Sequence, residues 1–459
     1  MVKFLSFFCA LMLLAGCSLA PKLELPEPSA PQAEENLTIA NDWWKDFGDH
    51  NLNALVDEAL EHNFDLLIAA SNVAEARAAL GIAESQQYPR LGIAGEGGRT
   101  WSRNPANTSS VIENDSYRLT GVLSYEVDLW GKIRDNKKAA LSALLAMEAT
   151  QDAVRISLAA GVAESYYSLL AVEQNIISVK TMLANKEESY TIRKWQAEQG
   201  ALSELLLHQV TADLIGTKVQ LVALERQKTA AATALAVLVG RTPKAIFEQS
   251  VATDERFPLV SLEGKQLPSD LVLRRADIKA AEESLRAANY SIGAARSAYF
   301  PSITLTGAAG YSSTELGDLI KKPSEIATAG VGINLPLFTF GQIGATVDAA
   351  KARKEAAVAR YEQSISKAFG EVYDALSRRE QATSRRDLLT EQVSARSSVL
   401  ELTRIQYDAG LKVYTDVIDA ETDYLNAKMS LVSAEFENVS AQVGLYKALG
   451  GGWQNRQED

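Results

Sequence analysis

The sequence predicts a mainly helical protein with a small β part, built from a unit that occurs twice. No proline lies between Pro105 and Pro243 or after Pro336, so long helices can run uninterrupted through both stretches. Each unit is expected to hold a pair of strands followed by a long helical hairpin. Three pairs of glycines lie at equivalent points of the two units, each pair 210 residues apart: Gly131 and Gly341, Gly200 and Gly410, and Gly240 and Gly450.

The two units divide the folded part of the chain into residues 43–250 and residues 251–459, the second ending in a short C-terminal tail. Alternation of apolar and polar residues predicts the strands, and glycines and prolines bound the helical runs. In the first unit, strands are expected at 90–103 and 116–128, around a loop at 104–114, and the hairpin at 133–239. In the second, a helix is expected at 268–297, strands at 302–313 and 326–337, and the hairpin at 343–449.

The return helix of the second hairpin, roughly residues 413 to 449, carries a seven-residue repeat, the period of coiled coils. Its two apolar stripes lie two positions apart, which is about 200° of rotation on a helix. The helix is therefore expected to pack on both flanks, as in the wall of a tube, although an ordinary bundle with a wide core fits the same pattern. The stripes are Ile418, Leu425, Val432, Val439 and Tyr446, and Ala420, Ala427, Ala434, Ala441 and Ala448.

Two polar arcs separate these stripes, and in a tube one arc would face outward and the other would line the lumen. The first is Glu421, Lys428, Glu435 and Gln442, and the second is Asp416, Asp419, Asp423, Asn426, Ser430 and Ser433. Each outgoing helix of about 67 residues should be roughly 100 Å long, and each return helix of about 39 residues roughly 58 Å. The helices that precede the strands are therefore expected to stack end to end with the return helices.

The expected strands have one apolar face and the length of membrane-spanning β-strands. Aromatic residues such as Trp101, Tyr117, Tyr311 and Phe338 fall towards strand ends, as in an interfacial girdle. Four strands cannot close a barrel, and an open edge in lipid leaves backbone groups unpaired. We therefore expect a barrel shared between subunits. A water-exposed four-stranded sheet packed on helices is the alternative.

The first residues are typical of a lipoprotein signal. Residues 1–16 combine Lys3 with a short apolar run and end in Leu14-Ala15-Gly16, directly before Cys17. This pattern resembles the bacterial lipobox, which implies that cleavage leaves Cys17 as the first residue, carrying an N-acyl group and a diacylglycerol lipid. Residues 17–42 are rich in proline and acidic side chains, and we expect them to form an extended tether from that lipid.

Composition argues against several other classes of protein. The formal net charge is −12 and there is no basic run, which disfavours nucleic-acid binding. No stretch approaches 18 consecutive apolar residues, so no transmembrane helix is expected. The three histidines, His50, His62 and His208, are too scattered for a metal site. Gly131-Lys132 is followed by Ile133, and a phosphate-binding loop would need serine or threonine there. No enzymatic activity and no other cofactor are expected.

The chain resembles the TolC-type outer-membrane factors, in particular the lipoprotein branch (OprM-like, NodT-like) of tripartite efflux systems. The resemblance runs from about Trp43 to Gly451. It rests on motifs that occur in the family's order: Trp43-Trp44 with Phe47, residues 59–69, Tyr88-Pro89, Asp128-Leu129-Trp130-Gly131, Leu335-Pro336-Leu337-Phe338 with Gly341, and Tyr407-Asp408-Ala409-Gly410.

The resemblance implies a homotrimer, with a 12-stranded β-barrel in the cell outer membrane that continues into a 12-helix α-barrel in the periplasm. It implies a passive exit duct for small toxic compounds such as drugs. The partners would be a periplasmic adaptor and an inner-membrane pump, most simply of the resistance–nodulation–division type. Two alternatives stay open at this point, the duct of a type I protein secretion system and a periplasmic coiled-coil adaptor or scaffold without a pore.

In the family the hairpin tips form the gate, and the matching residues of this chain are candidates for it. Asp416 and Asp419 match an acidic ring at the constriction, and Tyr407 and Lys412 match positions that tie neighbouring hairpins together. The first unit departs from the pattern, because Leu205 and Leu206 stand where the second has Thr415 and Asp416. These leucines are expected either to form an apolar constriction or to belong to the helix seam.

Overall fold

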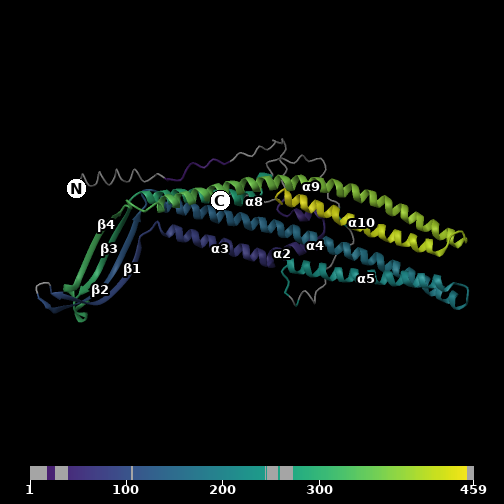
Figure 1. The fold of residues 1–459 in the computed structure, drawn as a ribbon, viewed down its shortest axis with the longest axis horizontal. Helices are drawn as coiled ribbons and strands as arrows, with labels where there is room; N and C mark the ends of the chain where they lie inside the picture. The colour runs from purple at the N-terminus through teal and green to yellow at the C-terminus, as the bar shows by residue number, and fades with distance from the viewer. Residues whose placement is uncertain are drawn as a thin grey trace. The chain divides into compact units, whose positions relative to one another are not determined.

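The computed structural model describes residues 18–25, 40–104, 107–242, 244, 257–258 and 272–451. The same order of elements occurs twice, as a helix, two strands and a long helical hairpin (Figure 1). In chain order the elements are η1 (Trp43–Phe47), α2 (His50–His62), α3 (Phe64–Ser85), β1 (Arg90–Asn104), β2 (Asn107–Val127), α4 (Lys132–Glu198), α5 (Glu204–Leu238), α8 (Ala276–Arg296), η2 (Ser297–Tyr299), β3 (Ser302–Ser313), η3 (Leu316–Asp318), η4 (Lys322–Ser324), β4 (Glu325–Asn334), α9 (Gln342–Asp408) and α10 (Tyr414–Ala448).

The compact units of the fold are not the two sequence repeats. Unit 1 contains Asn72–Glu148 and Ala280–Glu362 together with residues 18–25, and unit 2 contains the described parts of Pro28–Ser71, Ala149–Lys279 and Gln363–Asp459. Each repeat therefore gives its strands to unit 1 and most of its hairpin to unit 2. The division at residues 250 and 251 describes the duplication of the sequence and not the domains of the fold.

The sheet of unit 1 is antiparallel, with strand order β1-β2-β3-β4 and a register that is regular except for one shift between Arg103 and Asn104. Directly paired residues lie on one face of a sheet, and the register carries one apolar face across the strands. The pairs include Leu91 with Leu123, Val127 with Ile303, Ile303 with Ile333, Tyr125 with Leu305, and Leu305 with Val331. The opposite face is mostly polar or small, with Thr120, Ser124, Glu126, Thr304, Thr306 and Thr328. The predicted alternation is thus confirmed.

The predicted loop at 104–114 is wrong, because the pairing of β1 with β2 continues as far as Asn104 and Asn107. Arg99 binds Asp115 across the strands at 2.5 Å and approaches Glu113 at 3.7 Å. Polar residues can extend a hairpin in this way wherever the backbone bonds are made and the side chains are hydrated. The strands predicted at 90–103 and 116–128 therefore belong to a longer hairpin.

Two boundaries in the second repeat also differ from the prediction. The strand predicted at 326–337 is β4, Glu325–Asn334, because Pro336 has no amide to donate to a ladder. The helix predicted at 268–297 is represented by α8, Ala276–Arg296, and residues 268–271 lie outside the described residues. The strand at 302–313 and the two hairpins are confirmed to within a few residues.

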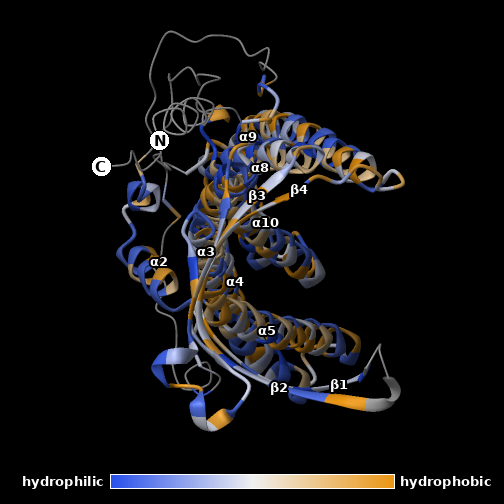
Figure 2. Cartoon of the chain, turned by 90° about the vertical axis from the view of Figure 1, so that its left-hand side faces the viewer, coloured by the Kyte–Doolittle hydropathy of each residue, from blue (hydrophilic) through white to orange (hydrophobic). Residues whose placement is uncertain are grey.

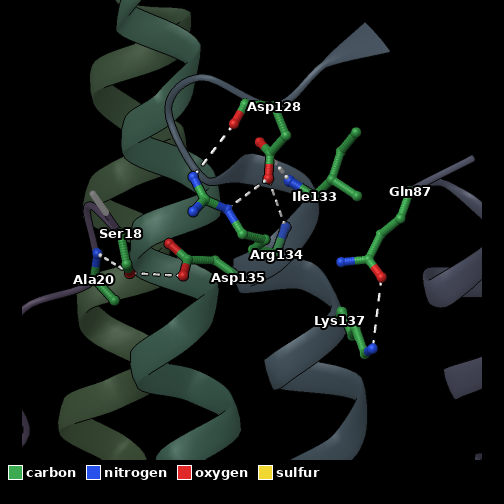
Figure 3. A network of polar contacts seen from close by, with 8 residues as sticks. All are labelled: Ser18, Ala20, Gln87, Asp128, Ile133, Arg134, Asp135 and Lys137. Carbon is green, nitrogen blue, oxygen red and sulfur yellow. Dashed lines mark hydrogen bonds and ion pairs between the residues drawn. The ribbon is translucent and has the colours of Figure 1, made fainter. Parts of the chain in front are cut away.

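The motif at residues 128–131 starts α4. The Asp128 carboxylate accepts from the amides of Ile133 at 3.1 Å and Arg134 at 3.0 Å (Figure 3), so it satisfies two of the amides that a helix start leaves free. Trp130 donates from Nε1 to the Pro301 carbonyl at 2.8 Å. One motif therefore ends a strand, caps a helix and joins the two repeats.

Unit 2 contains most of the two hairpins, which pack around an aromatic core together with η1 and α2. Each outgoing helix has 67 residues, as predicted, and each return helix has 35. Trp43 is fully buried and stacks on Tyr446 at 5.1 Å between ring centroids. Both predicted stripes of α10 are buried, apart from Ile418 and Ala441, which are half-buried. Figure 2 shows hydrophobic and hydrophilic residues side by side on α4 and α5, as expected of helices with more than one packed flank.

One predicted polar arc of α10 does not face solvent. Glu421 and Gln442 are buried, while Lys428 and Glu435 are half-buried. Arg404 of α9 donates to Glu421 at 2.7 Å, and Gln442 donates to Asn438 at 2.7 Å. Polar partners on the hairpin thus replace water along this arc, and burial raises the pKa of Glu435. The second arc is exposed at Asp419, Asp423, Asn426 and Ser433.

The shorter helices stack end to end with the return helices, as predicted. Asn63 caps α3 by accepting from the Leu66 amide at 3.0 Å, and it donates to the Leu238 carbonyl at the end of α5 at 2.8 Å. At the equivalent point of the second repeat, Arg275 donates to the Ala448 carbonyl at the end of α10 at 2.8 Å. Each junction satisfies a carbonyl that the end of a helix would leave without a partner.

One described helix, α3, is long and apolar enough to cross a membrane by length and composition, which differs from our expectation. Only 11% of its most apolar window is buried within the chain. Core helices of other proteins meet the same criterion, and Glu75 and Arg77 interrupt the apolar sequence of α3.

We predict that the junction between α5 and α3 tolerates no side chain at position 240. In Gly240→Ala the new Cβ would lie 2.2 Å from the His62 carbonyl oxygen, in addition to the strain of a φ of 81°. Gly200→Ala is the matched control, because its φ is 71° but no atom lies within 4 Å. The control should cost about 1 kcal/mol, and Gly240→Ala about 2 kcal/mol more. Helical circular dichroism on heating in detergent would measure both, and equal midpoints would contradict the stacked junction.

Candidate functional site at the hairpin tips

Two turns of the same design reverse the chain at the tips. Gly200 and Gly410 adopt left-handed φ angles of 71° and 75°. Their amides donate to the carbonyls of Ala197 and Tyr407, and the following residue in each turn bonds one residue further back. This is the Schellman end of a helix, which favours glycine. The two repeats thus have the same backbone hydrogen bonds in their tip turns.

The two hairpins meet at Arg193. This residue lies on α4, and its guanidinium carbon is 3.5 Å from the ring centroid of Tyr414 and 5.4 Å from that of Tyr407. The two rings are 5.4 Å apart in an edge-to-face arrangement. Arg193 is buried, so water competes little for its charge. A cation of the first hairpin is therefore held by aromatic rings of the second.

An apolar cluster surrounds this contact. Val210, Tyr414 and Val417 are buried together, and Leu206, Tyr190 and Ile418 pack against them. Leu206 therefore belongs to the packed tip, whereas Leu205 is 70% exposed. The two leucines that the sequence analysis treated as a pair have different surroundings, because neighbouring residues on a helix point about 100° apart.

Asp416 and Asp419 lie on the same side of the first turns of α10. Asp416 is half-buried and Asp419 is exposed. Carboxylates are favoured near the start of a helix, where free amides give a partial positive charge. Neither aspartate contributes to the buried stripes, so both are available to a surface outside this hairpin.

Tyr407 and Lys412 differ in their surroundings. Tyr407 is half-buried against Arg193 and Tyr414 of its own chain. Lys412 is exposed, and no ion pair joins it to Glu198, Glu204 or any other carboxylate of the described residues. Tyr407 therefore contacts residues of its own chain, whereas Lys412 has no such contact among the described residues.

Ion pairs brace each hairpin further from its tip. Lys186 is buried and donates to Asp213 at 2.7 Å and to Thr217 at 3.1 Å, which joins α4 to α5. In the second hairpin Arg396 and Asp423, each 210 residues further along the chain, make the corresponding link between α9 and α10 at 2.7 Å. Arg193 and Lys186 escaped the sequence analysis, because they are charged residues at positions that continue the seven-residue row of Val172 and Val179 on α4.

Two further predictions concern sites outside this tip. Cys17, the predicted lipidation site, lies outside the described residues. Among the residues that were searched, no group of three or more His, Cys, Asp or Glu side chains could hold a metal ion.

A model of the outer membrane efflux protein family matches the chain twice, over residues 55–241 and 267–451. The chain belongs to this family. The two matches begin 212 residues apart, which independently reproduces the duplication.

Relatives of known structure or function cover nearly the whole chain. The chain is 34% identical to the cation efflux system protein CusC of Escherichia coli, covering 97% of this chain and 98% of CusC. It is also 34% identical to the toluene efflux pump outer membrane protein TtgC of Pseudomonas putida, covering 98% of this chain and 95% of TtgC. The crystal structure of the Campylobacter jejuni CmeC outer membrane channel superposes with a TM-score of 0.89 at 30% identity, covering 96% of each chain.

This outer membrane efflux protein is thus an outer-membrane channel component of an efflux system. The predicted family, the predicted fold class and the predicted location in the outer membrane are confirmed. The pore-free adaptor and the protein-secretion duct considered from the sequence are not the classes that these relatives support.

We predict that Arg193 couples the two hairpins. Arg193→Gln should weaken the tip by about 2 kcal/mol, the scale of a desolvated cation–π contact, and should raise the resting conductance in planar bilayers. Lys194→Gln is the control, because Lys194 is the exposed neighbour on the same helix. Tyr407→Phe should behave like the wild type, because the contact uses the ring and not the hydroxyl. A normal resting conductance in Arg193→Gln would contradict the coupling.

Proposed function

We propose that the protein works as a homotrimer, in which three chains complete one barrel and one pore. The observation that carries this proposal is the open sheet of unit 1. Its edge strands β1 and β4 each have one unpaired side, and their apolar side chains Leu91, Ile93, Val331 and Ile333 are between 66% and 84% exposed. In lipid, free backbone groups cost several kcal/mol each.

The topology suits closure by copies of the same chain. With four antiparallel strands in the order β1-β2-β3-β4, the β1 strand of a second copy is antiparallel to β4 of the first. Such a head-to-tail contact closes into a ring under cyclic symmetry. The number three comes from the resemblance to the TolC-type factors, because two copies would also close a barrel of eight strands. The exposed apolar residues of α3, among them Leu67, Ile68 and Ile82, support a further contact between subunits.

In this proposal the channel is the passive exit of a tripartite system. An inner-membrane pump of the resistance–nodulation–division type supplies the energy, and a periplasmic adaptor connects the pump to the hairpin tips. The cargo would be small toxic compounds. A cation-system relative and a toluene-pump relative are each 34% identical to this chain, so we propose that the pump selects the cargo.

The tips would form the gate of the trimer. Threefold symmetry would bring the Asp416 and Asp419 carboxylates of the three chains into one narrow ring, while Arg193 holds each chain's two hairpins together. A ring of carboxylates attracts cations. In this arrangement Lys412 is exposed and free to reach a neighbouring chain, and Leu205 projects from the tip surface of the first hairpin.

We predict that removing the ring carboxylates changes ion selectivity without dissociating the trimer. Asp416→Ala combined with Asp419→Ala should lower cation selectivity in planar bilayers and weaken block by multivalent cations added at the tip side. Asp408→Ala is the control, because it removes an exposed carboxylate near the same tip from the outgoing helix. Heat-resistant migration on a gel would show that the trimer persists. Block as strong as in the wild type would remove these residues from the pore.

We also propose that Cys17 is lipidated after cleavage at residue 16. Cys17→Ser should leave an unprocessed precursor and abolish incorporation of a palmitate analogue, whereas Cys9→Ser, within the signal, should do neither. Because the barrel provides most of the hold in the membrane, a form with a non-lipid signal peptide should still insert. Normal processing of Cys17→Ser would overturn this part of the proposal.

A further inference from the structure

The residues that directly follow Cys17 are bound to the helices of unit 1. Ser18 donates from its hydroxyl to Asp135 of α4 at 2.6 Å, as Figure 3 shows. The carbonyls of Leu19 and Pro21 accept from Arg296 at 3.1 Å and Asn289 at 2.9 Å, both on α8. The expected extended tether therefore starts with a segment, residues 18–21, that two helices hold at three points.

The groove that holds this segment is shaped around a glycine. A Cβ at Gly293 of α8 would lie 2.0 Å from Asp135 Oδ2 and 2.6 Å from the Ala20 nitrogen. The segment and the carboxylate thus fill the space that a side chain at residue 293 would need. Glycine is less favourable than alanine inside a helix, and the close approach of another backbone is a physical reason for a glycine at position 293.

Two polar side chains of the groove that contact the segment are buried. Asp135 is 0% exposed and Asn289 is 4% exposed. Burial raises the pKa of Asp135, while the Ser18 hydroxyl acts in the opposite direction. Removing the segment would take these hydrogen-bond partners away from the buried Asp135 carboxylate and Asn289 amide, and a buried polar group without a partner is costly.

We infer that the groove formed by Asp135, Asn289, Gly293 and Arg296 is a docking site for the residues next to the lipidated cysteine, and that it fixes where the lipid leaves the protein. This inference rests on the proposed lipidation of Cys17. Cys17 is one residue from Ser18, about 3.8 Å between Cα atoms.

The position of the groove suits an anchor at the membrane surface. Asp135 is the fourth residue of α4, which starts at Lys132 shortly after β2 ends at Val127. At about 1.5 Å per residue, Asp135 is within roughly 5 Å of the start of the helix. The docked segment therefore holds the lipid at the end of the strands that leads into the helices, where the acyl chains enter the leaflet beside the barrel.

The groove also selects the residue at position 18. Serine provides the donor that the buried Asp135 carboxylate needs. An aspartate at position 18 would place a second carboxylate against the first, which disfavours ionisation of both. Alanine would leave Asp135 Oδ1 without this donor.

Trypsin cleavage at Lys22 tests docking separately from lipidation. The Lys22 side chain is 88% exposed, but a protease must pull several residues on each side of the bond into its own site, and docking of residues 18–21 resists this. The purified trimer, labelled with a palmitate analogue in cells, is digested in detergent. Release of the labelled peptide then reports undocking, and the label present before digestion reports lipidation.

Gly293→Ala should release the labelled peptide at least ten times faster than the wild type while carrying the same amount of label. Gly370→Ala is the matched control, because it is also a helical glycine but no atom lies within 4 Å of its added Cβ; it should release label at the wild-type rate. Ser18→Ala and Asn289→Ala should each accelerate release, which keeps the test valid if Gly293→Ala fails to form trimers.

Equal release rates in the wild type and in Gly293→Ala, Asn289→Ala and Ser18→Ala would overturn the docking site. Absence of label from the wild type would overturn the lipidation instead, and docking would then be read from the mass of the N-terminal peptide that trypsin releases.

Discussion

The main constraint on this structure is that the backbone groups at the two free edges of the sheet need hydrogen-bond partners. Lipid offers no donor or acceptor to an unpaired strand edge, and the sheet formed by β1 to β4 ends in two such edges. Its apolar face makes the requirement specific, because that face is stable only against lipid or another apolar surface. Within one chain both edges stay unpaired, and the apolar side chains Leu91, Ile93, Val331 and Ile333 stay exposed.

The helices meet the same requirement, that backbone hydrogen-bonding groups must find partners. A return helix of 35 residues cannot accompany an outgoing helix of 67 residues along its length, and the end-to-end junctions at Asn63 and Arg275 supply the missing length. Each junction uses a side chain to cap a helix end, so a break in the backbone does not leave unsatisfied carbonyls. The two repeats reach this result with different residues, an amide in one and a guanidinium in the other.

The tip combines a contact within the chain with charged groups that take no part in it. Arg193, Tyr407 and Tyr414 lock the two hairpins of one chain together. Asp416, Asp419 and Lys412 take no part in that lock. The docked residues 18–21 show a comparable division of roles at the other end of α4, where polar groups buried in the helices hold a segment without regular secondary structure.

The sequence by itself determined the duplication, the helix lengths and the alternating strands, because these depend on periodicities and on glycine and proline, which act locally. It also identified Gly200 and Gly410 as turns, since a helix end in the left-handed conformation favours glycine. Only the tertiary structure decided which polar groups meet. The Arg193 contact and the docking of Ser18 on Asp135 join residues that are distant in sequence. The burial of Glu421 and the different surroundings of Leu205 and Leu206 depend on which side of each helix is packed. Their positions depend on how helices pack, and no local preference encodes that.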